Sequence, residues 1–193
     1  LMRSSAASDV YKRQLMTDRK PLPGKLAFSR DLFVLLFLLR GMPFVDLAFL
    51  RRCDLQGNVI TYHRRKTSRK LTVVVGKEAM EIIQKYMYAI PDSPYLFPII
   101  QNPGKDEYGQ YARMLRLQNY RLTQVANILG IRDRLSTYTA RHTWATTALR
   151  QNYNSSLICD AMGHSSVKVT ETYFQPYSCL LYTSPSPRDG ATS

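Results

Sequence analysis

A small set of side chains that could take part in phosphoryl transfer follows one order along the chain. Lys66 lies in a strongly basic stretch, Arg141 follows Tyr138 by three residues, His164 closes a Met-Gly-His triplet, and Tyr173 comes nine residues after that histidine. A guanidinium matches phosphate oxygens bidentately and stays charged at any working pH. A phenol can act as an oxygen nucleophile, and an ammonium can protonate a leaving group. These residue types therefore suit the breaking and making of phosphate esters.

Taken singly, each of these residues has an ordinary explanation. Lysines in a basic turn are usually solvated, a histidine after Gly163 fits the C-terminal cap of a helix, and a helical tyrosine usually serves packing. The chain holds 13 tyrosines, so Tyr173 gains meaning only from its spacing to His164. The order and spacing of the set carry the functional interpretation.

The hydrophobic pattern predicts the elements that must position these residues. Ser29 is a candidate N-cap for an apolar helix that ends near residue 39. Gly41 breaks that helix, and Pro43 suits the first turn of a second one over residues 44–50. Two β-rich runs flank a basic tip at residues 64–70 and predict a hairpin. The remaining predicted elements are helices over residues 78–88, 108–129, 140–149, 156–162 and 167–174; the predicted strands are 59–63 and 71–75. We therefore expect one domain that is mainly α with a small antiparallel β-sheet (α+β).

Composition narrows the class of protein. Of 193 residues, 45% are hydrophobic, which excludes wholesale disorder. The longest apolar run, residues 32–39, is too short to span a bilayer. Three cysteines without C-x-x-C spacing favour neither a disulfide framework nor a zinc site. The formal charge of +13 indicates a polyanionic partner, of which nucleic acid is the commonest.

The two ends of the chain show a relation that protein sequences should not have. Residues 4–14 back-translate to a DNA string containing AGATGTGTATAAGAGACA, and residues 179–184 back-translate to its reverse complement. We interpret residues 1–14 and 179–193 as translated sequencing adapters, with native protein from 15 to 178; the alternative is a pair of real disordered tails. Four of the 27 basic and two of the 14 acidic residues lie in these ends, so the rest keeps a net charge of +11.

The joint pattern resembles the catalytic domain of tyrosine recombinases, the phage integrase family. That family reads H-x-x-R-H, then L-G-H, then a tyrosine nine positions on, downstream of a hairpin lysine in a K-T context. The matching residues here are Lys66-Thr67, Tyr138-Thr139-Ala140-Arg141-His142, Met162-Gly163-His164 and Tyr173. The sequence looks most similar to integrases of conjugative transposons from gut bacteria.

The resemblance implies a site-specific DNA recombinase that integrates or excises a mobile element. Tyr173 would attack the scissile phosphate and form a 3′-phosphotyrosine, Arg141 would clamp the phosphate, His164 would hydrogen-bond it, and Lys66 would be the general acid. The resemblance implies neither a cofactor nor a metal ion.

Two positions depart from the family pattern. Pro43 stands where the family has its first arginine, and Arg40 lies three residues earlier, nearly one helical turn or about 5 Å along the axis. Arg40 is either a displaced catalytic arginine or a charge at the C-terminus of a helix. Other candidates for the missing arginine are Arg51, Arg64 and Arg65. Tyr138 stands at the family's first histidine, where a phenol donates a hydrogen bond but is a poorer base. A catalytically inactive DNA-binding remnant is therefore the alternative function.

The resemblance also implies the partners. Double-stranded DNA would be held through its phosphates, and the candidate contacts are Arg64, Arg65, Arg69, Lys70, Arg113, Arg116 and Arg121. The protein would act in the bacterial cytoplasm, on the nucleoid and not at a membrane, as a homo-multimer, expected to be a tetramer, on paired sites, with DNA-bending proteins as possible accessories. An N-terminal DNA-binding domain would lie upstream of residue 15.

Overall fold

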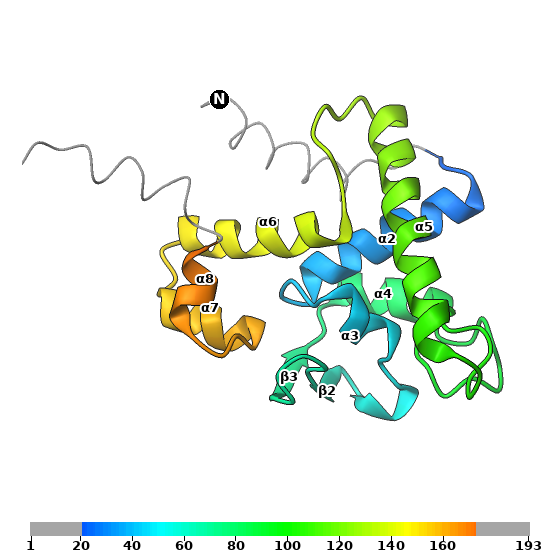
Figure 1. The fold of residues 1–193 in the computed structure, drawn as a ribbon, viewed down its shortest axis with the longest axis horizontal. Helices are drawn as coiled ribbons and strands as arrows, with labels where there is room; N and C mark the ends of the chain where they lie inside the picture. Colours follow the sequence, from blue (N-terminus) through cyan, green and yellow to red (C-terminus); the bar gives the residue numbers. More distant parts are fainter. Residues whose placement is uncertain (1–20, 173–193) are drawn as a thin grey trace, which may run out of the picture.

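The computed structural model describes residues 21–172, in which helices predominate over one small antiparallel sheet (Figure 1). This confirms the expected fold class. In chain order the elements are α2 (Gly24–Leu38), α3 (Phe44–Ala48), a 3-10 turn η1 (Arg52–Asp54), β1 (Leu55–Gln56), β2 (Val59–His63), β3 (Lys70–Val74), α4 (Lys77–Tyr86), α5 (Glu107–Ile128), α6 (Thr137–Arg150), α7 (Ser155–Met162) and α8 (Val167–Glu171).

Helix α2 is the central element of the core, because it packs against α4, α5 and α6. Leu32, Phe33, Leu35 and Leu36 on this helix are at most 1% exposed. These residues point in several directions around the helix, and a helix that is apolar on most sides is expected to be buried. The long α5 crosses α2, and both lie beside the first turns of α6 (Figure 1).

The predicted start of α2 at Ser29 is wrong. The helix begins at Gly24, where the backbone amides of Leu26 and Ala27 bond to the carbonyl of Pro23. Ser29 lies more than a turn inside the helix and is fully buried, and its carbonyl accepts a hydrogen bond from Gln118 Nε2 at 2.7 Å. The preference of serine for N-caps is a local effect of about 1 kcal/mol, and the packing of Leu26 and Phe28 against the core outweighs it.

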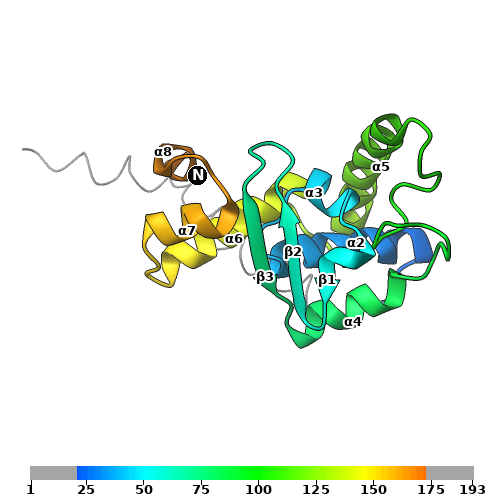
Figure 2. The ribbon, with the colours of Figure 1, turned by 90° about the horizontal axis from the view of Figure 1, so that it is seen from below.

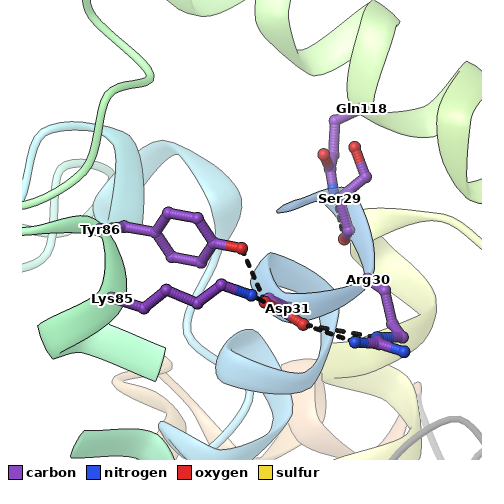
Figure 3. A network of polar contacts seen from close by, with 6 residues as sticks. All are labelled: Ser29, Arg30, Asp31, Lys85, Tyr86 and Gln118. Carbon is purple, nitrogen blue, oxygen red and sulfur yellow. Dashed lines mark hydrogen bonds and ion pairs between the residues drawn. The ribbon is translucent and has the colours of Figure 1, made fainter. Parts of the chain in front are cut away.

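A polar network ties α2 to α4 (Figure 3). Asp31 is 7% exposed, and its Oδ2 accepts hydrogen bonds from Lys85 Nζ and Tyr86 Oη, each at 2.7 Å. Arg30 Nη2 lies 3.3 Å from the other carboxylate oxygen. Every buried oxygen of this acid thus faces a donor, and the network serves to fix the two helices together.

The sheet has the strand order β1-β2-β3, and all neighbours are antiparallel (Figure 2). Along β2, Ile60 and Tyr62 are buried, whereas Val59, Thr61 and His63 are more exposed, as the two-residue period of a strand requires. The predicted hairpin is confirmed, with β3 starting one residue earlier than expected. The two-residue strand β1 was not predicted.

A second, smaller apolar cluster joins α6 to α7. It consists of Ala145, Ala148, Ile158 and Met162, with Trp144 packed against it. Helix α7 ends at Gly163, which adopts φ of +65° as the expected C-terminal cap. None of the helices within residues 21–172 is both long and apolar enough to cross a membrane.

Candidate active site

Arg141 is the most constrained charged residue of the site. It lies on α6, which starts at Thr137, three residues earlier than predicted, because Ser136 and Thr139 form a capping box there. The side chain is 4% exposed, its Nη1 donates to the carbonyl of Gly41, and its Nη2 lies 2.8 Å from the carbonyl of Met162. A guanidinium held at both ends in this way is already oriented before any ligand arrives.

Because residue 41 is a glycine, helix α6 can pack closely against the turn that follows α2. Its backbone has φ of +67°, and a Cβ placed on it would lie 3.2 Å from Arg141 Cα and 3.3 Å from Arg141 Cγ. A larger residue would strain the backbone and press on the arginine. The helix break predicted at Gly41 thus also serves the close approach of Arg141.

His164 is held on both ring nitrogens. Arg141 Nη2 lies 2.7 Å from Nε2, and Thr170 Oγ1 lies 2.8 Å from Nδ1. Because a guanidinium can only donate, Nε2 must accept, so the proton of the neutral ring lies on Nδ1 and is donated to Thr170. Burial, and then the positive charges of Arg141, Arg64 and Lys66, lower the pKa of His164 to about 4.

Three arginines hold three consecutive carbonyls where α7 ends. Arg141 bonds to Met162 O, Arg64 Nη1 to Gly163 O at 2.6 Å, and Arg69 Nη1 to His164 O at 3.3 Å. The last carbonyls of a helix carry partial negative charge and have no partner within the helix. The hairpin and α6 are thereby fixed to the segment that presents His164.

The hairpin tip places one arginine inside the site and leaves a lysine outside. Arg64 is 7% exposed, and its Nε lies 3.7 Å from Oδ2 of Asp46, which is 3% exposed. Burial raises the pKa of Asp46, although a hydrogen bond from the backbone of Arg65 and the nearby arginines oppose this effect. Lys66 is exposed, and its charge contributes to the low pKa of His164. Burial is also the main reason that the pKa of the neighbouring Tyr62 phenol is raised.

The structure thus brings Arg141 into contact with His164, and the charge of Lys66 acts on that histidine, whereas the side chain of Arg40 bonds to the sheet. Arg40 adopts φ of +59°, and its Nη1 lies 3.4 Å from the carbonyl of Thr72. It also lines a groove of about 540 Å³ between α2, α6 and α7. Its charge is not among those that lower the pKa of His164.

The remaining expected site residues are Tyr138 and Tyr173. Tyr138 lies in the first turn of α6, three residues before Arg141, and is 59% exposed. Tyr173, the expected nucleophile, lies outside the described residues.

The expected DNA contacts fall on two surfaces. On the hairpin, Lys70 is exposed, Arg65 lies over the ring of Phe49 at 3.8 Å, and Arg69 pairs with Asp160 at 3.0 Å. On α5, Arg113 and Arg116 are exposed and Arg121 is half-buried.

The sequence analysis missed Asp46 and Thr170. The signal for Asp46 was a single acid inside the apolar run at residues 44–50. Thr170 gave no signal, because its contact with His164 depends on the path of the chain between them. Within residues 21–172, no group of three or more His, Cys, Asp or Glu side chains could hold a metal ion.

A helical domain that fixes an arginine and a histidine beside a basic hairpin is the arrangement expected of an integrase catalytic domain. The chain belongs to the phage integrase family, whose model matches residues 8–178. It is 26% identical over 167 residues to tyrosine recombinase XerC of Thermodesulfovibrio yellowstonii, covering 79% of this chain and 52% of XerC. The chain therefore spans about half the length of that relative.

Two solved structures share the fold. The XerH site-specific recombinase bound to difH substrate, in a pre-cleavage complex, has a TM-score of 0.64 and 16% identity over 91% of this chain and 51% of that chain. The Tn1549 transposon integrase in complex with a circular intermediate DNA has a TM-score of 0.59 and 16% identity over 92% of this chain and 64% of that chain. The expected tyrosine recombinase catalytic-domain fold is confirmed.

Proposed function

We propose that this chain is the catalytic domain of a site-specific recombinase that breaks and rejoins double-stranded DNA to integrate or excise a mobile element. The observation that carries the proposal is the burial of two guanidiniums, those of Arg141 and Arg64, beside His164, whose pKa is lowered, with the carboxyl of Asp46 near Arg64. Buried cations are costly unless they meet an anion. Two buried guanidiniums beside a single described carboxyl favour a further anion, and a phosphodiester entering beside His164 would supply it.

The proposed reaction needs no external energy source. The Tyr173 oxygen attacks phosphorus and gives its phenolic proton to water, the bond from phosphorus to the 5′-oxygen breaks, and Lys66 gives its proton to the departing oxygen. Arg141 stabilises the charge on the non-bridging oxygens during both steps. The 5′-hydroxyl of another strand then attacks the 3′-phosphotyrosine, which releases the tyrosine and joins the new strand.

We assign the role of the missing first arginine to Arg64 rather than to Arg40. Arg64 is buried beside the carbonyl that follows Met162, and its charge acts on His164, whereas Arg40 faces the sheet and the groove. If this assignment is right, Arg40→Ala retains cleavage within a few-fold, and Arg64→Lys loses it although the charge remains. Equal loss in both variants, with DNA binding unchanged, contradicts the assignment.

The decisive experiment traps the covalent intermediate. Nicked duplexes are copied from the DNA that flanks the gene at its source, so that the cleaved strand diffuses away and the adduct accumulates. A protein–DNA adduct resistant to denaturant is expected from the unchanged protein and not from Tyr173→Phe. Tyr153→Phe, which alters an exposed tyrosine between α6 and α7, is the matched control and keeps the adduct.

Pro43, at the family's position for the first arginine, is the observation that favours the second candidate, an inactive DNA-binding remnant. The same experiment separates the two functions. A remnant binds the duplexes with the usual salt dependence but forms no adduct.

We infer the partners from the basic surfaces of the hairpin and α5 and from the DNA named with the similar structures. The protein would bind DNA phosphates through these surfaces and assemble as a multimer, a tetramer in the simplest case, on paired sites in the bacterial cytoplasm. Accessory DNA-bending proteins are compatible with that assembly. Footprinting and sedimentation of the complex on paired sites test this proposal.

We also propose that residues 15–178 are the native part of the chain, preceded in the gene by a DNA-binding domain. Amplifying and sequencing the locus from its source DNA tests both statements. A locus that encodes residues 4–14 and 179–184 as printed would refute the adapter interpretation. The protein completed from that locus is the preferred material for the cleavage assay, alongside the 193-residue chain.

A further inference from the structure

Thr170 stands out among the buried polar groups because its side chain meets His164 from the helix that precedes Tyr173. It is 0% exposed on α8, and its Oγ1 lies 2.8 Å from His164 Nδ1. Arg141 approaches the other ring nitrogen at 2.7 Å. The imidazole is therefore fixed between a group that only donates and a hydroxyl that can donate or accept.

The chemistry of the proposed reaction asks His164 to change its hydrogen-bonding role. In the DNA-free structure Nε2 accepts from Arg141, so the proton lies on Nδ1. To stabilise a phosphate oxygen, Nε2 must instead carry a hydrogen and donate it. The ring can do so by gaining a proton or by moving its proton from Nδ1 to Nε2.

Gaining a proton is the costlier route at neutral pH. The ring is 4% exposed, and the charged groups that act on it are all positive: Arg141 from α6, and Arg64 and Lys66 from the hairpin. Two further groups touch its backbone carbonyl, namely Arg69 Nη1 and the Cys159 thiol. An imidazolium here would add a further positive charge to a buried positive cluster.

We propose that Thr170 is a positioning residue that lets His164 switch tautomer, accepting from Nδ1 in the free protein and donating to Nδ1 when Nε2 donates to a phosphate. The ring keeps the same number of protons and the same charge, because Nδ1 gives one proton to water and Nε2 takes one from water. The threonine O–H rotates about its C–O bond and satisfies either state. This inference rests on the proposed recombinase function for its phosphate-bound half.

Two substitutions at Thr170, one to valine and one to serine, test the contribution of its hydroxyl group. Thr170→Val keeps the branched shape and removes the hydrogen bond, whereas Thr170→Ser keeps the hydroxyl. The valine variant loses the hydrogen bond to His164, the imidazole that is proposed to donate to the charged phosphate. Adduct formation should therefore slow about ten- to a hundredfold. The serine variant should stay within about threefold of the unchanged protein.

Thr143→Val is the matched control. Thr143 is 3% exposed on α6, and its Oγ1 donates to the carbonyl of Thr139 at 2.7 Å, so it tests the cost of removing a buried threonine hydroxyl that bonds only its own helix. It should leave adduct formation unchanged. Melting temperature and DNA affinity are measured for all variants, so that misfolding is separated from a slow reaction.

Nitrogen-15 spectra of the imidazoles report the tautomer directly, and with three histidines in the chain His164→Gln assigns the signal. The DNA-free chain should show His164 protonated on Nδ1. A Tyr173→Phe protein bound to the duplex that the unchanged protein cleaves should show it protonated on Nε2. With Thr170→Val added, that inversion should be lost.

The two arms of the experiment fail differently. If no flanking duplex yields an adduct, the recombinase proposal fails, while the DNA-free spectrum still tests the contact with Thr170. A ring protonated on Nε2 in the free chain overturns the inference by itself. So does a valine variant that cleaves as fast as the unchanged protein, a serine variant that folds and binds DNA but cleaves as slowly as valine, or a doubly protonated ring on the bound duplex.

Discussion

Two buried polar networks within residues 21–172 differ in which charge is buried. Around Asp31 the carboxylate is enclosed at 7% exposure, while the side chain of its partner Lys85 keeps 54% exposure and reaches water. Around His164 the cations are enclosed instead: Arg141 is 4% exposed and Arg64 is 7% exposed. The first network is complete within the protein. In the second network the guanidiniums contact carbonyl oxygens, and Arg64 also lies near the carboxyl of Asp46, whose pKa is raised.

The difference separates a structural network from one that we propose to be functional. The buried acid Asp31 accepts hydrogen bonds from a guanidinium, a phenol and an ammonium, which fixes α2 to α4 and satisfies both carboxylate oxygens. Arg64 and Arg141 are both buried beside carbonyls and an imidazole, and the nearby carboxyl is that of Asp46, 3.7 Å from Arg64, so the burial of two cations is costly. We therefore propose that Arg141 and His164 form the place where this fold receives a phosphate.

The largest expected effect breaks the second network at its centre. Arg141→Lys keeps the charge but loses the fork that contacts Gly41, Met162 and His164. Adduct formation on the nicked duplex should fall by about a hundredfold or more, with DNA affinity changed only a few-fold. Arg132→Lys, an exposed arginine before α6, is the control and should cleave normally. Normal cleavage by Arg141→Lys would show that the buried fork has no role at the phosphate.

The pH dependence of stability sharpens the comparison, because only the second network contains a histidine. The pKa of His164 is about 4 in the folded chain and near 6.5 when unfolded. The unfolded chain therefore binds more protons between these values, so stability is full above pH 6.5 and falls as the pH drops toward 4. The loss should be on the order of 1–3 kcal/mol.

Urea denaturation at pH 7 and pH 4.5 measures that loss, and the difference between the unchanged chain and His164→Gln removes the contribution of other groups. The glutamine variant should show a smaller fall in unfolding free energy between the two pH values. An equal fall in both chains would mean that His164 titrates normally in the folded state.

Sequence reasoning recovered the elements better than the contacts between them. The strand at residues 59–63 and the cap at Gly163 follow from local periodicity and backbone preference, so they were predictable. The start of α2 was not, because burial of Ser29 depends on α5, which lies about 90 residues away in sequence. Likewise the position of Arg40 could be stated only as two alternatives, since its direction depends on the left-handed turn it forms with Gly41.

The site shows the same limit. The spacing shared with the family motif predicted that Arg141 and His164 belong to one site, and they are in contact. Nothing in that spacing distinguishes the buried Arg64 from its exposed neighbours Arg65 and Lys66. Asp46 decides that difference by pairing with Arg64 across 18 residues. Composition alone does not tell which charged residue will form an ion pair in the folded chain and which will remain solvated.

Breaking the first network should affect stability and leave the reaction intact. Asp31→Asn removes the negative charge to which Lys85 and Tyr86 donate hydrogen bonds. The unfolding free energy should fall by about 2 kcal/mol and not more, since the Lys85 ammonium can turn to water. Asp92→Asn in an exposed loop is the control, with a change within about 0.5 kcal/mol. At a temperature where Asp31→Asn is folded, it should bind and cleave DNA normally. A folded variant that fails to cleave would place this network in the reaction.

The smallest effect concerns charges that belong to neither network. Arg116 is exposed on α5, and Arg116→Ala should weaken DNA binding several-fold, equally on all sequences, with stability changed by less than about 0.5 kcal/mol. A lost phosphate contact lowers the slope of log affinity against log salt concentration by about 1. Lys77→Ala is the control, because α4 lies at the opposite end of the sheet from the hairpin tip (Figure 2) and the slope should not change. Fluorescence anisotropy across a salt series measures both slopes. If Lys77→Ala lowers the slope as much as Arg116→Ala, the protein holds DNA through its diffuse charge, and the exposed face of α5 is no dedicated contact surface.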